Sequence, residues 1–98
     1  MEITYKNKKL QKICTDFTKA ERTYGQDMAF KIYQRINEIH ASPNVDIMIR
    51  DHLGDCHRLN QDRKGQFAVH LKQPYRMVFT VNGDEVQIAN IADIVDYH

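Results

Sequence analysis

The strongest constraint on the fold is a pair of alternating segments in the second half of the chain. Residues 65–72 read GQFAVHLK and residues 75–81 read YRMVFTV. Alternation of side-chain character predicts β-strands, because successive residues of a strand point to opposite faces. Gln73-Pro74 lies between the segments and predicts a turn. The sequence therefore predicts two neighbouring strands that pair in an antiparallel sheet.

Each of these segments has one apolar side and one mixed side. The apolar sides carry Phe67, Val69, Leu71, Tyr75, Met77, Phe79 and Val81. The opposite sides carry Gln66, Ala68, His70, Arg76, Val78 and Thr80. A strongly apolar sheet face must pack against another layer, and the first half of the chain can supply that layer.

The first half of the chain predicts two helices joined by a short turn. Asn7 is suited to cap the first helix, Gly25 to end it, and Asp27 to open the second. Ser42-Pro43-Asn44 stops the second helix. The apolar stripes at helical spacing consist of Leu10, Ile13, Cys14, Phe17 and Tyr24, then Ala29, Ile32, Ile36 and Ile39.

Further strands are expected on both sides of the alternating pair. Residues 2–5 and 56–60 are short strand candidates, and residues 85–91 follow Asn82-Gly83, a dipeptide typical of a two-residue type I′ turn. The predicted fold is α+β, with an N-terminal helix hairpin packed on one face of a small, mainly antiparallel sheet. For 98 residues we expect a single domain, residues 1–98. The other sheet face stays open, and Arg76 is expected to point towards it or towards its rim.

Charge and cysteine content exclude several other classes. The net charge of +1 gives no overall field that would attract nucleic acid, so any basic patch must be local. No apolar segment reaches the ~18 residues of a membrane span, and the start of the chain lacks a signal-peptide run. We therefore expect a cytoplasmic protein with no membrane partner. Cys14 and Cys56 should be reduced, and Cys56, His57 and His52 fit no structural zinc spacing, so no metal is predicted.

Two segments carry groups suited to proton transfer. The first, CHRLNQDRKGQF, contains His57 before a charged turn, and the second is the terminal Asp96-Tyr97-His98. In an antiparallel meander the end of the last strand can approach an earlier strand. We therefore expect His57, Arg76 and His98 to converge on the open face.

Such a set suits the cleavage of RNA without a metal. The ribose 2′-hydroxyl attacks the adjacent phosphate, so one group takes a proton and another protonates the leaving 5′-oxygen, a task for histidines. Arg76 can steady the phosphorane charge, and Tyr97 can stack on a base. A structural interpretation stays open for each: Arg76 as an ion-pair partner, and Arg63 and Lys64 as a soluble turn. Surface or capping roles are expected for His40, His52 and His70.

The segment HRLNQDRKGQFAVHLKQPYRMVF, with the terminal DYH, resembles the HigB branch of the RelE/ParE superfamily. These proteins are the toxin halves of type II toxin–antitoxin pairs, some known as killer proteins. KKLQKI and YGQDMAFKIYQRINEIHASPN are similar to the helical half of the branch, so the resemblance covers nearly the whole chain. It implies a RelE-like fold and a ribosome-dependent endoribonuclease, or mRNA interferase, that needs no metal or cofactor.

The resemblance also implies partners and residue roles. The expected partners are the 70S ribosome with mRNA in its A site, and a HigA-like helix-turn-helix antitoxin through which the pair contacts operator DNA. His57, His98 and Asp96 would transfer protons, with acid and base left open. Arg76 would stabilise the transition state, and Tyr97 would position a base or the reactive ribose. The implied RNA-binding residues are Arg63, Lys64 and Asn60.

Two positions depart from the pattern of the branch. Asn60 stands where the branch has lysine, and Gln61 stands where it has glycine. The first change removes a cation from the predicted site. Two other functions on the same fold stay open. His57 and the terminal DYH argue against the first, a ParE-like gyrase poison, which needs no proton-transfer groups. The loss of the cation at Asn60 favours the second, a catalytically weak regulator that only binds its antitoxin.

Overall fold

The sheet is an antiparallel meander extended by one parallel strand. This computed structural model describes residues 1–60 and 63–96. Over these residues the strand order is β1-β5-β4-β3-β2, with β1 parallel to β5 and every other pair antiparallel. The strand bounds are Glu2–Tyr5 (β1), His57–Arg58 (β2), Gln66–His70 (β3), Tyr75–Asn82 (β4) and Ile88–Asp96 (β5).

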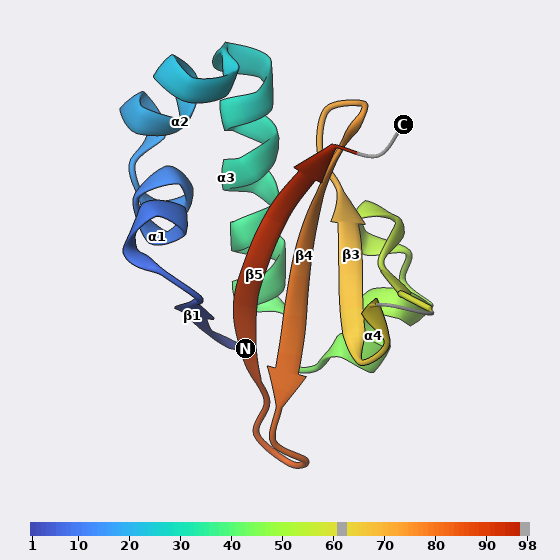
Figure 1. Cartoon of the computed structure of the whole chain (residues 1–98). Helices are drawn as coiled ribbons and strands as arrows, with labels where there is room; N and C mark the ends of the chain where they lie inside the picture. Colours follow the sequence, from blue (N-terminus) through green and yellow to red (C-terminus); the bar gives the residue numbers. More distant parts are fainter. Residues whose placement is uncertain (61–62, 97–98) are drawn as a thin grey trace.

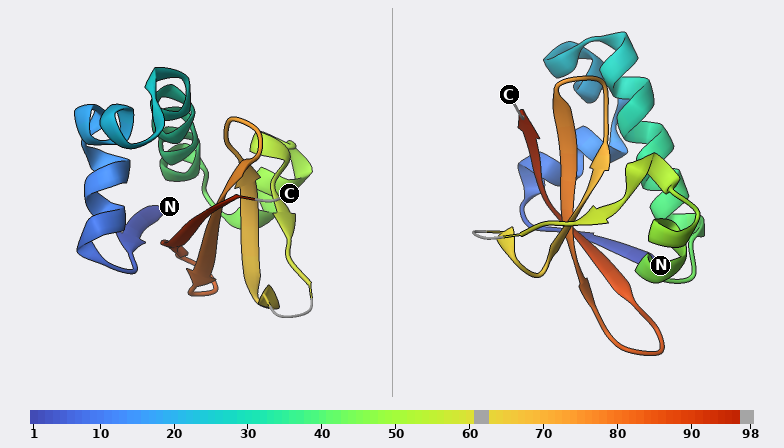
Figure 2. Two further views of the ribbon diagram at one scale, coloured as in Figure 1. Left: turned by 45° about the horizontal axis from the view of Figure 1, so that its top comes forward. Right: turned by 90° about the vertical axis from the view of Figure 1, so that its right-hand side faces the viewer.

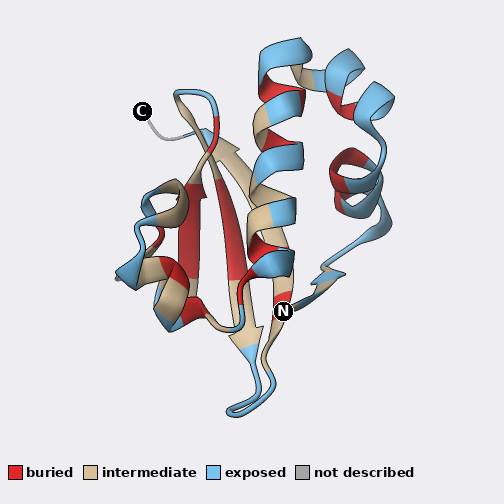
Figure 3. Cartoon of the chain, turned by 180° about the vertical axis from the view of Figure 1, so that it is seen from behind, coloured by how far each residue is buried: buried red, intermediate tan, exposed pale blue. Residues whose placement is uncertain are grey.

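The helices cover one face of this sheet (Figure 3). Figure 1 looks onto the opposite face, across which no helix of the described chain passes, and Figure 2 shows the two layers from other sides. The predicted α+β class and one-sided cover are confirmed. No helix in the described residues is long and apolar enough to span a membrane. The helix bounds are Lys8–Thr15 (α1), Phe17–Tyr24 (α2), Gln26–Ala41 (α3) and Val45–Arg50 (α4), and a 3-10 turn, η1 (Leu53–Asp55), leads into β2.

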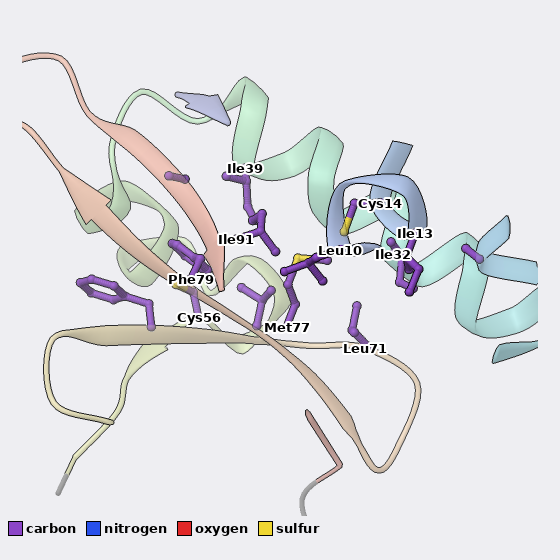
Figure 4. Close-up of a cluster of buried hydrophobic side chains, with 14 of the residues drawn as sticks. Leu10, Ile13, Cys14, Ile32, Ile39, Cys56, Leu71, Met77, Phe79 and Ile91 are labelled. Carbon is purple, nitrogen blue, oxygen red and sulfur yellow. The ribbon is translucent and has the colours of Figure 1, made fainter. Parts of the chain in front are cut away.

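The core lies between α3 and the central strands. Ile32 and Ile39 of α3 are fully buried, as are Met77 and Phe79 of β4 and Ile91 of β5 (Figure 4). Burial of each such side chain stabilises the fold by about 1.5–3 kcal/mol. Because these strand residues must face the helices, the residues between them point to the open face.

The predicted first helix is two helices in the structure. Asp16 has extended backbone angles (φ −121°, ψ 101°) and separates α1 from α2. Its Oδ1 accepts a hydrogen bond from the Lys19 N–H at 3.2 Å, so it caps a new helix start. The prediction of one continuous helix was therefore wrong. Asn7 and Gly25 do cap helices as predicted, with the Leu10 N–H donating to Asn7 Oδ1 at 2.8 Å.

A short helix and a wide loop also differ from the prediction. Asn44 caps α4 by accepting from the Ile47 N–H at 2.9 Å, but six residues are too few to show a helical period. Asn82 pairs with Ile88, so residues 83–87 form the loop in place of a two-residue turn. Gly83 has a φ of 94°, and a Cβ there would run into the Val86 carbonyl. This close approach explains the glycine without a type I′ turn.

Because the loop is wider than predicted, the last strand begins and ends later in the sequence than predicted. It runs Ile88–Asp96 where residues 85–91 were predicted, so Asp96 belongs to the sheet. A β-bulge shifts its register, since Val78 pairs with Asp93 whereas Phe79 pairs with Ile91. The strand predicted over residues 56–60 is only two residues long.

Candidate functional site

A row of side chains crosses the open face on four strands. His57 of β2 pairs with Ala68 of β3, which pairs with Val78 of β4, which pairs with Asp93 of β5. Residues that pair across a sheet share a face. Ala68 and Val78 are fully buried, so His57 and Asp93 flank a small apolar floor.

A second row lies beside the first and contains a cation. His70 of β3 pairs with Arg76 of β4, which pairs with Val95 of β5. His70 and Arg76 are both half-buried. Because His70 is two residues from the Ala68 partner of His57, the two histidines are diagonal neighbours, and their ring centroids are 6.4 Å apart. The open face therefore brings both histidines close to the central arginine.

One turn residue, Asp55, contacts both histidines. His57 Nδ1 lies 2.8 Å from the Asp55 carbonyl oxygen, and His70 Nε2 lies 3.1 Å from the Asp55 Oδ2. The φ of Asp55 is 52°, in the left-handed region, and His52 and Gly54 have φ values of 57° and 58°. This run of left-handed residues places one carboxylate at the edge of the site.

The surroundings of His70 favour its neutral form. Burial lowers the pKa of His70 below its ordinary value, and the positive charge of Arg76 lowers it further. His57 and Arg35 act in the same direction, whereas the Asp55 carboxylate opposes them. A neutral imidazole can accept a proton, so His70 is suited to act as a base near neutral pH.

Arg63, in the charged turn, places its side chain on the open face. Its Nη2 lies 3.5 Å from Asp93 Oδ2, and its Nη1 donates to Gln66 Oε1 at 3.3 Å. Gln66 is also on the open face, because its neighbour in the strand faces the core. Arg63 therefore adds a second guanidinium to this face, at the far side of the apolar floor from His70.

Asn60 and Lys64 lie together elsewhere, at the outer edge of the sheet. They line a hollow with Arg58 and Phe67. The Arg58 guanidinium carbon lies 5.0 Å from the Phe67 ring centroid, a cation–π distance. The predicted phosphate-binding residues are thus divided between the open face and the β2–β3 edge.

The predicted terminal trio lies only partly within the described residues. Asp96 ends β5 and pairs with Tyr75, one position beyond the pair of Arg76 with Val95. Because side chains alternate along a strand, Asp93 shares the face of Arg76, and Asp96 is on the other side. Tyr97 and His98 lie outside the described residues, so their roles stay predictions.

The two thiols belong to the hydrophobic core. Cys14 and Cys56 are buried, and burial raises the pKa of Cys14 to about 12 and that of Cys56 to about 11. Both thiols are therefore protonated and unreactive near neutral pH. Within residues 1–60 and 63–96, no three His, Cys, Asp or Glu side chains gather as a metal site would require.

Asp55, His70 and Asp93 join the site without having been predicted. His70, expected as a surface or capping residue, could have been found, because an antiparallel pair turning at Gln73-Pro74 places it opposite Arg76. The position of Asp55 depends on left-handed backbone angles, for which the sequence gives no periodic signal. The place of Asp93 depends on the bulge in β5.

Solved structures with this arrangement of helices and strands are known. A YoeB/ParE toxin from Agrobacterium tumefaciens matches with a TM-score of 0.60 at 17% identity, and all of both chains is covered. The chain shares the fold of this toxin. The YoeB–YefM complex from Staphylococcus aureus matches with a TM-score of 0.55 at 20% identity, covering 100% of this chain and 97% of that one. No protein-family model and no curated protein sequence matches the chain.

Proposed function

We propose that this chain is the toxin of a type II toxin–antitoxin pair, of the HigB branch, and that it cuts mRNA on the ribosome. One observation carries the proposal: His57, His70 and Arg76 lie side by side on the sheet face that no helix of the described chain covers. An open face can admit a large substrate. The fold likeness to two solved toxins and the sequence resemblance to the HigB branch support the same function.

The chemistry is attack by the ribose 2′-oxygen on the adjacent phosphorus, without a metal. A base takes the 2′-hydroxyl proton, the O2′–P bond forms, and the P–O5′ bond breaks as an acid protonates the leaving oxygen. The products are a 2′,3′-cyclic phosphate and a 5′-hydroxyl. Arg76 stabilises the extra negative charge of the phosphorane with its planar guanidinium. His57 is one of the two proton-transfer groups.

The remaining predicted residues act around this centre. His98 assists proton transfer, and Tyr97 positions a base or the ribose. Asp96 takes no direct part in proton transfer, because its side chain is on the opposite side of β5 from Arg76. Arg63 binds phosphate on the open face. Phosphates further along the mRNA contact the edge hollow that contains Lys64 and Asn60.

The proposed protein partner is a HigA-like antitoxin, through which the pair contacts operator DNA in the cytoplasm. The YoeB–YefM structure is a complex of this general kind. In this chain, β1 pairs with β5 only from Ile88 to Ile91. From Ala92 to Ile94 the outer edge of β5 has no partner strand among the described residues, and a groove lined by Leu10, Ile13 and Tyr24 runs beside it. An extended antitoxin segment can pair with this edge.

Expression of the chain without an antitoxin tests the function. Growth should stop, and mRNA should be cut only where ribosomes translate. The variant with His57→Ala and Arg76→Ala that also lacks His98 should be harmless. Growth arrest that persists in this variant would contradict the proposal. DNA breaks with an intact mRNA pool would indicate a gyrase poison, and antitoxin binding without growth arrest would indicate a regulator.

A further inference from the structure

The two contacts of Asp55 determine which ring nitrogen of each histidine carries a proton. A main-chain carbonyl oxygen only accepts hydrogen bonds, so His57 Nδ1, at 2.8 Å, carries a hydrogen. An ionised carboxylate also only accepts, so His70 Nε2, at 3.1 Å, carries a hydrogen. In the neutral rings, the free lone pairs are then on Nε2 of His57 and Nδ1 of His70.

The turn that carries Asp55 has an uncommon backbone conformation, and Arg35 packs against it. Asp55 and His52 are non-glycine residues with left-handed φ values of 52° and 57°. Such conformations persist where the surroundings enforce them, and they cluster at functional sites. Arg35 packs against Gly54, so closely that a Cβ there would lie 2.7 Å from its Nε. The same Nε donates to the His70 carbonyl oxygen at 2.6 Å, which links the turn to β3.

We propose that His70 is a further catalytic residue of this face, the base that takes the 2′-hydroxyl proton, with Asp55 as its positioning residue and His57 as the acid. This inference rests on the proposed function and assigns roles within it. His70 Nδ1 accepts the proton as the 2′-oxygen bonds to phosphorus. The P–O5′ bond then breaks, and the 5′-oxygen takes its proton from Nε2 of the His57 imidazolium.

The charged groups around His70 agree with this assignment. They are Arg35 on α3, Asp55 on η1, His57 on β2 and Arg76 on β4. Burial and the two arginines lower the pKa of His70, which favours the neutral form that a base requires. After proton transfer, the Asp55 carboxylate stabilises the new imidazolium across the 3.1 Å contact.

Cleavage of mRNA by the purified chain in a translating extract tests the role of His70. His70→Gln should lower the rate by roughly 100-fold or more, the usual range for loss of a general base. The matched control is His40→Gln, at a histidine that contacts the Met1 carbonyl oxygen and lies outside the site, and it should leave the rate unchanged. Thermal unfolding should show that both variants are folded.

The pH profile tests the role of Asp55. Asp55→Asn removes the charge, and asparagine tolerates a left-handed φ, so the turn should be retained. Because the Asp55 carboxylate raises the pKa of His70, its loss should move the acidic limb of kcat/KM to lower pH. A merely structural role for Asp55 would not move this limb. Asp51→Asn, in a surface pair with Arg50, is the charge-matched control.

Nitrogen NMR of the histidine rings gives a readout that needs no activity. The wild-type chain should show the neutral Nε2–H form of His70. Asp55→Gly removes the carboxylate, permits the left-handed φ and keeps the carbonyl contact to His57, so only the His70 signals should change. Unchanged His70 signals in Asp55→Gly would overturn the proposed contact between the Asp55 carboxylate and His70.

The two proposals fail in different ways. If the wild-type chain cuts mRNA and His70→Gln cuts it equally fast, the role of His70 is overturned and the proposed function stands. If the wild-type chain cuts no mRNA in translating extracts, the proposed function fails, and the catalytic role of His70 fails with it.

Discussion

The Nε of Arg35 on α3 donates a hydrogen bond to the main-chain carbonyl oxygen of His70 on β3, across 2.6 Å. The same guanidinium places Nη1 2.8 Å from the Glu38 carboxylate, and only 12% of the Arg35 side chain is exposed. One largely buried cation therefore connects the helix layer to the strand that carries the candidate base.

Arg35→Met should destabilise the chain while keeping most of the side-chain volume. The partly buried carbonyl of His70 would lose its charged donor, a change that costs about 1–3 kcal/mol of unfolding free energy. Urea denaturation measures the loss. Arg50→Met removes an exposed arginine that pairs with its sequence neighbour Asp51, and it should leave the denaturation midpoint unchanged. Equal effects in the two variants would contradict the role given to Arg35.

Gly54→Ala and Gly65→Ala form a matched pair of glycine substitutions. Both glycines have positive φ values, 58° and 88°, so both variants incur a backbone penalty of about 1 kcal/mol. Only at Gly54 would the new Cβ meet a side chain, Arg35, whereas nothing lies within 4 Å of a Cβ at Gly65. Gly54→Ala should therefore have the lower melting temperature. It should also lose more RNA cleavage, because Asp55 is the next residue.

The buried thiols should make stability decline at alkaline pH. Unfolded cysteines have a pKa near 8.5, whereas burial raises that of Cys14 to about 12 and that of Cys56 to about 11. Below about pH 8.5 both states keep their protons. Above it, the unfolded chain loses protons that the folded chain retains, so the free energy of unfolding falls as pH rises towards the folded pKa values.

Urea denaturation between about pH 7 and about pH 9.5 measures this slope, in a range where tyrosines contribute little. Cys14→Ala combined with Cys56→Ala should lower stability at every pH and flatten the slope. A slope that persists in the double variant would show that other groups cause it.

Asn60→Lys should strengthen RNA binding. The lysine would enter the hollow that already contains Lys64 and Arg58. One added phosphate contact should steepen the dependence of log affinity on log salt by about 0.7 for a single strand. Fluorescence anisotropy with a labelled RNA measures both quantities. Gln11→Lys, on the exposed side of α1, adds the same charge elsewhere and should leave the slope unchanged.

The central strands and their faces were predictable because their signal is local. A period of two over residues 65–81 places Met77 and Phe79 in the core, and it also places Arg76 on the open face. The break at Asp16 was not predictable from periodicity, because the apolar stripe runs through it. The role of Asp16 as an N-cap can be recognised only from its extended backbone angles in the structure.

The site was predictable only in part, because its geometry depends on backbone details. His57 and Arg76 could be proposed from residue type and alternation. The position of Asp55 depends on its left-handed backbone angles. The position of Asp93 depends on the bulge that shifts the register of β5. Neither feature has a signal in the sequence pattern. A five-residue loop after Asn82, where a tight turn was predicted, also moved Asp96 into the sheet.

The parallel pairing of β1 with β5 has a consequence for the order of folding. Glu2 pairs with Ile88, so β1 and β5 meet across nearly the whole length of the described chain. Pairing over such a long separation in sequence is slow, because the chain between must first be ordered. β5 also carries Asp93, which binds Arg63 on the open face. The rows of the open face on β3, β4 and β5 do not depend on the pairing of β1 with β5, because short connections join those three strands, so the face can form before β1 docks.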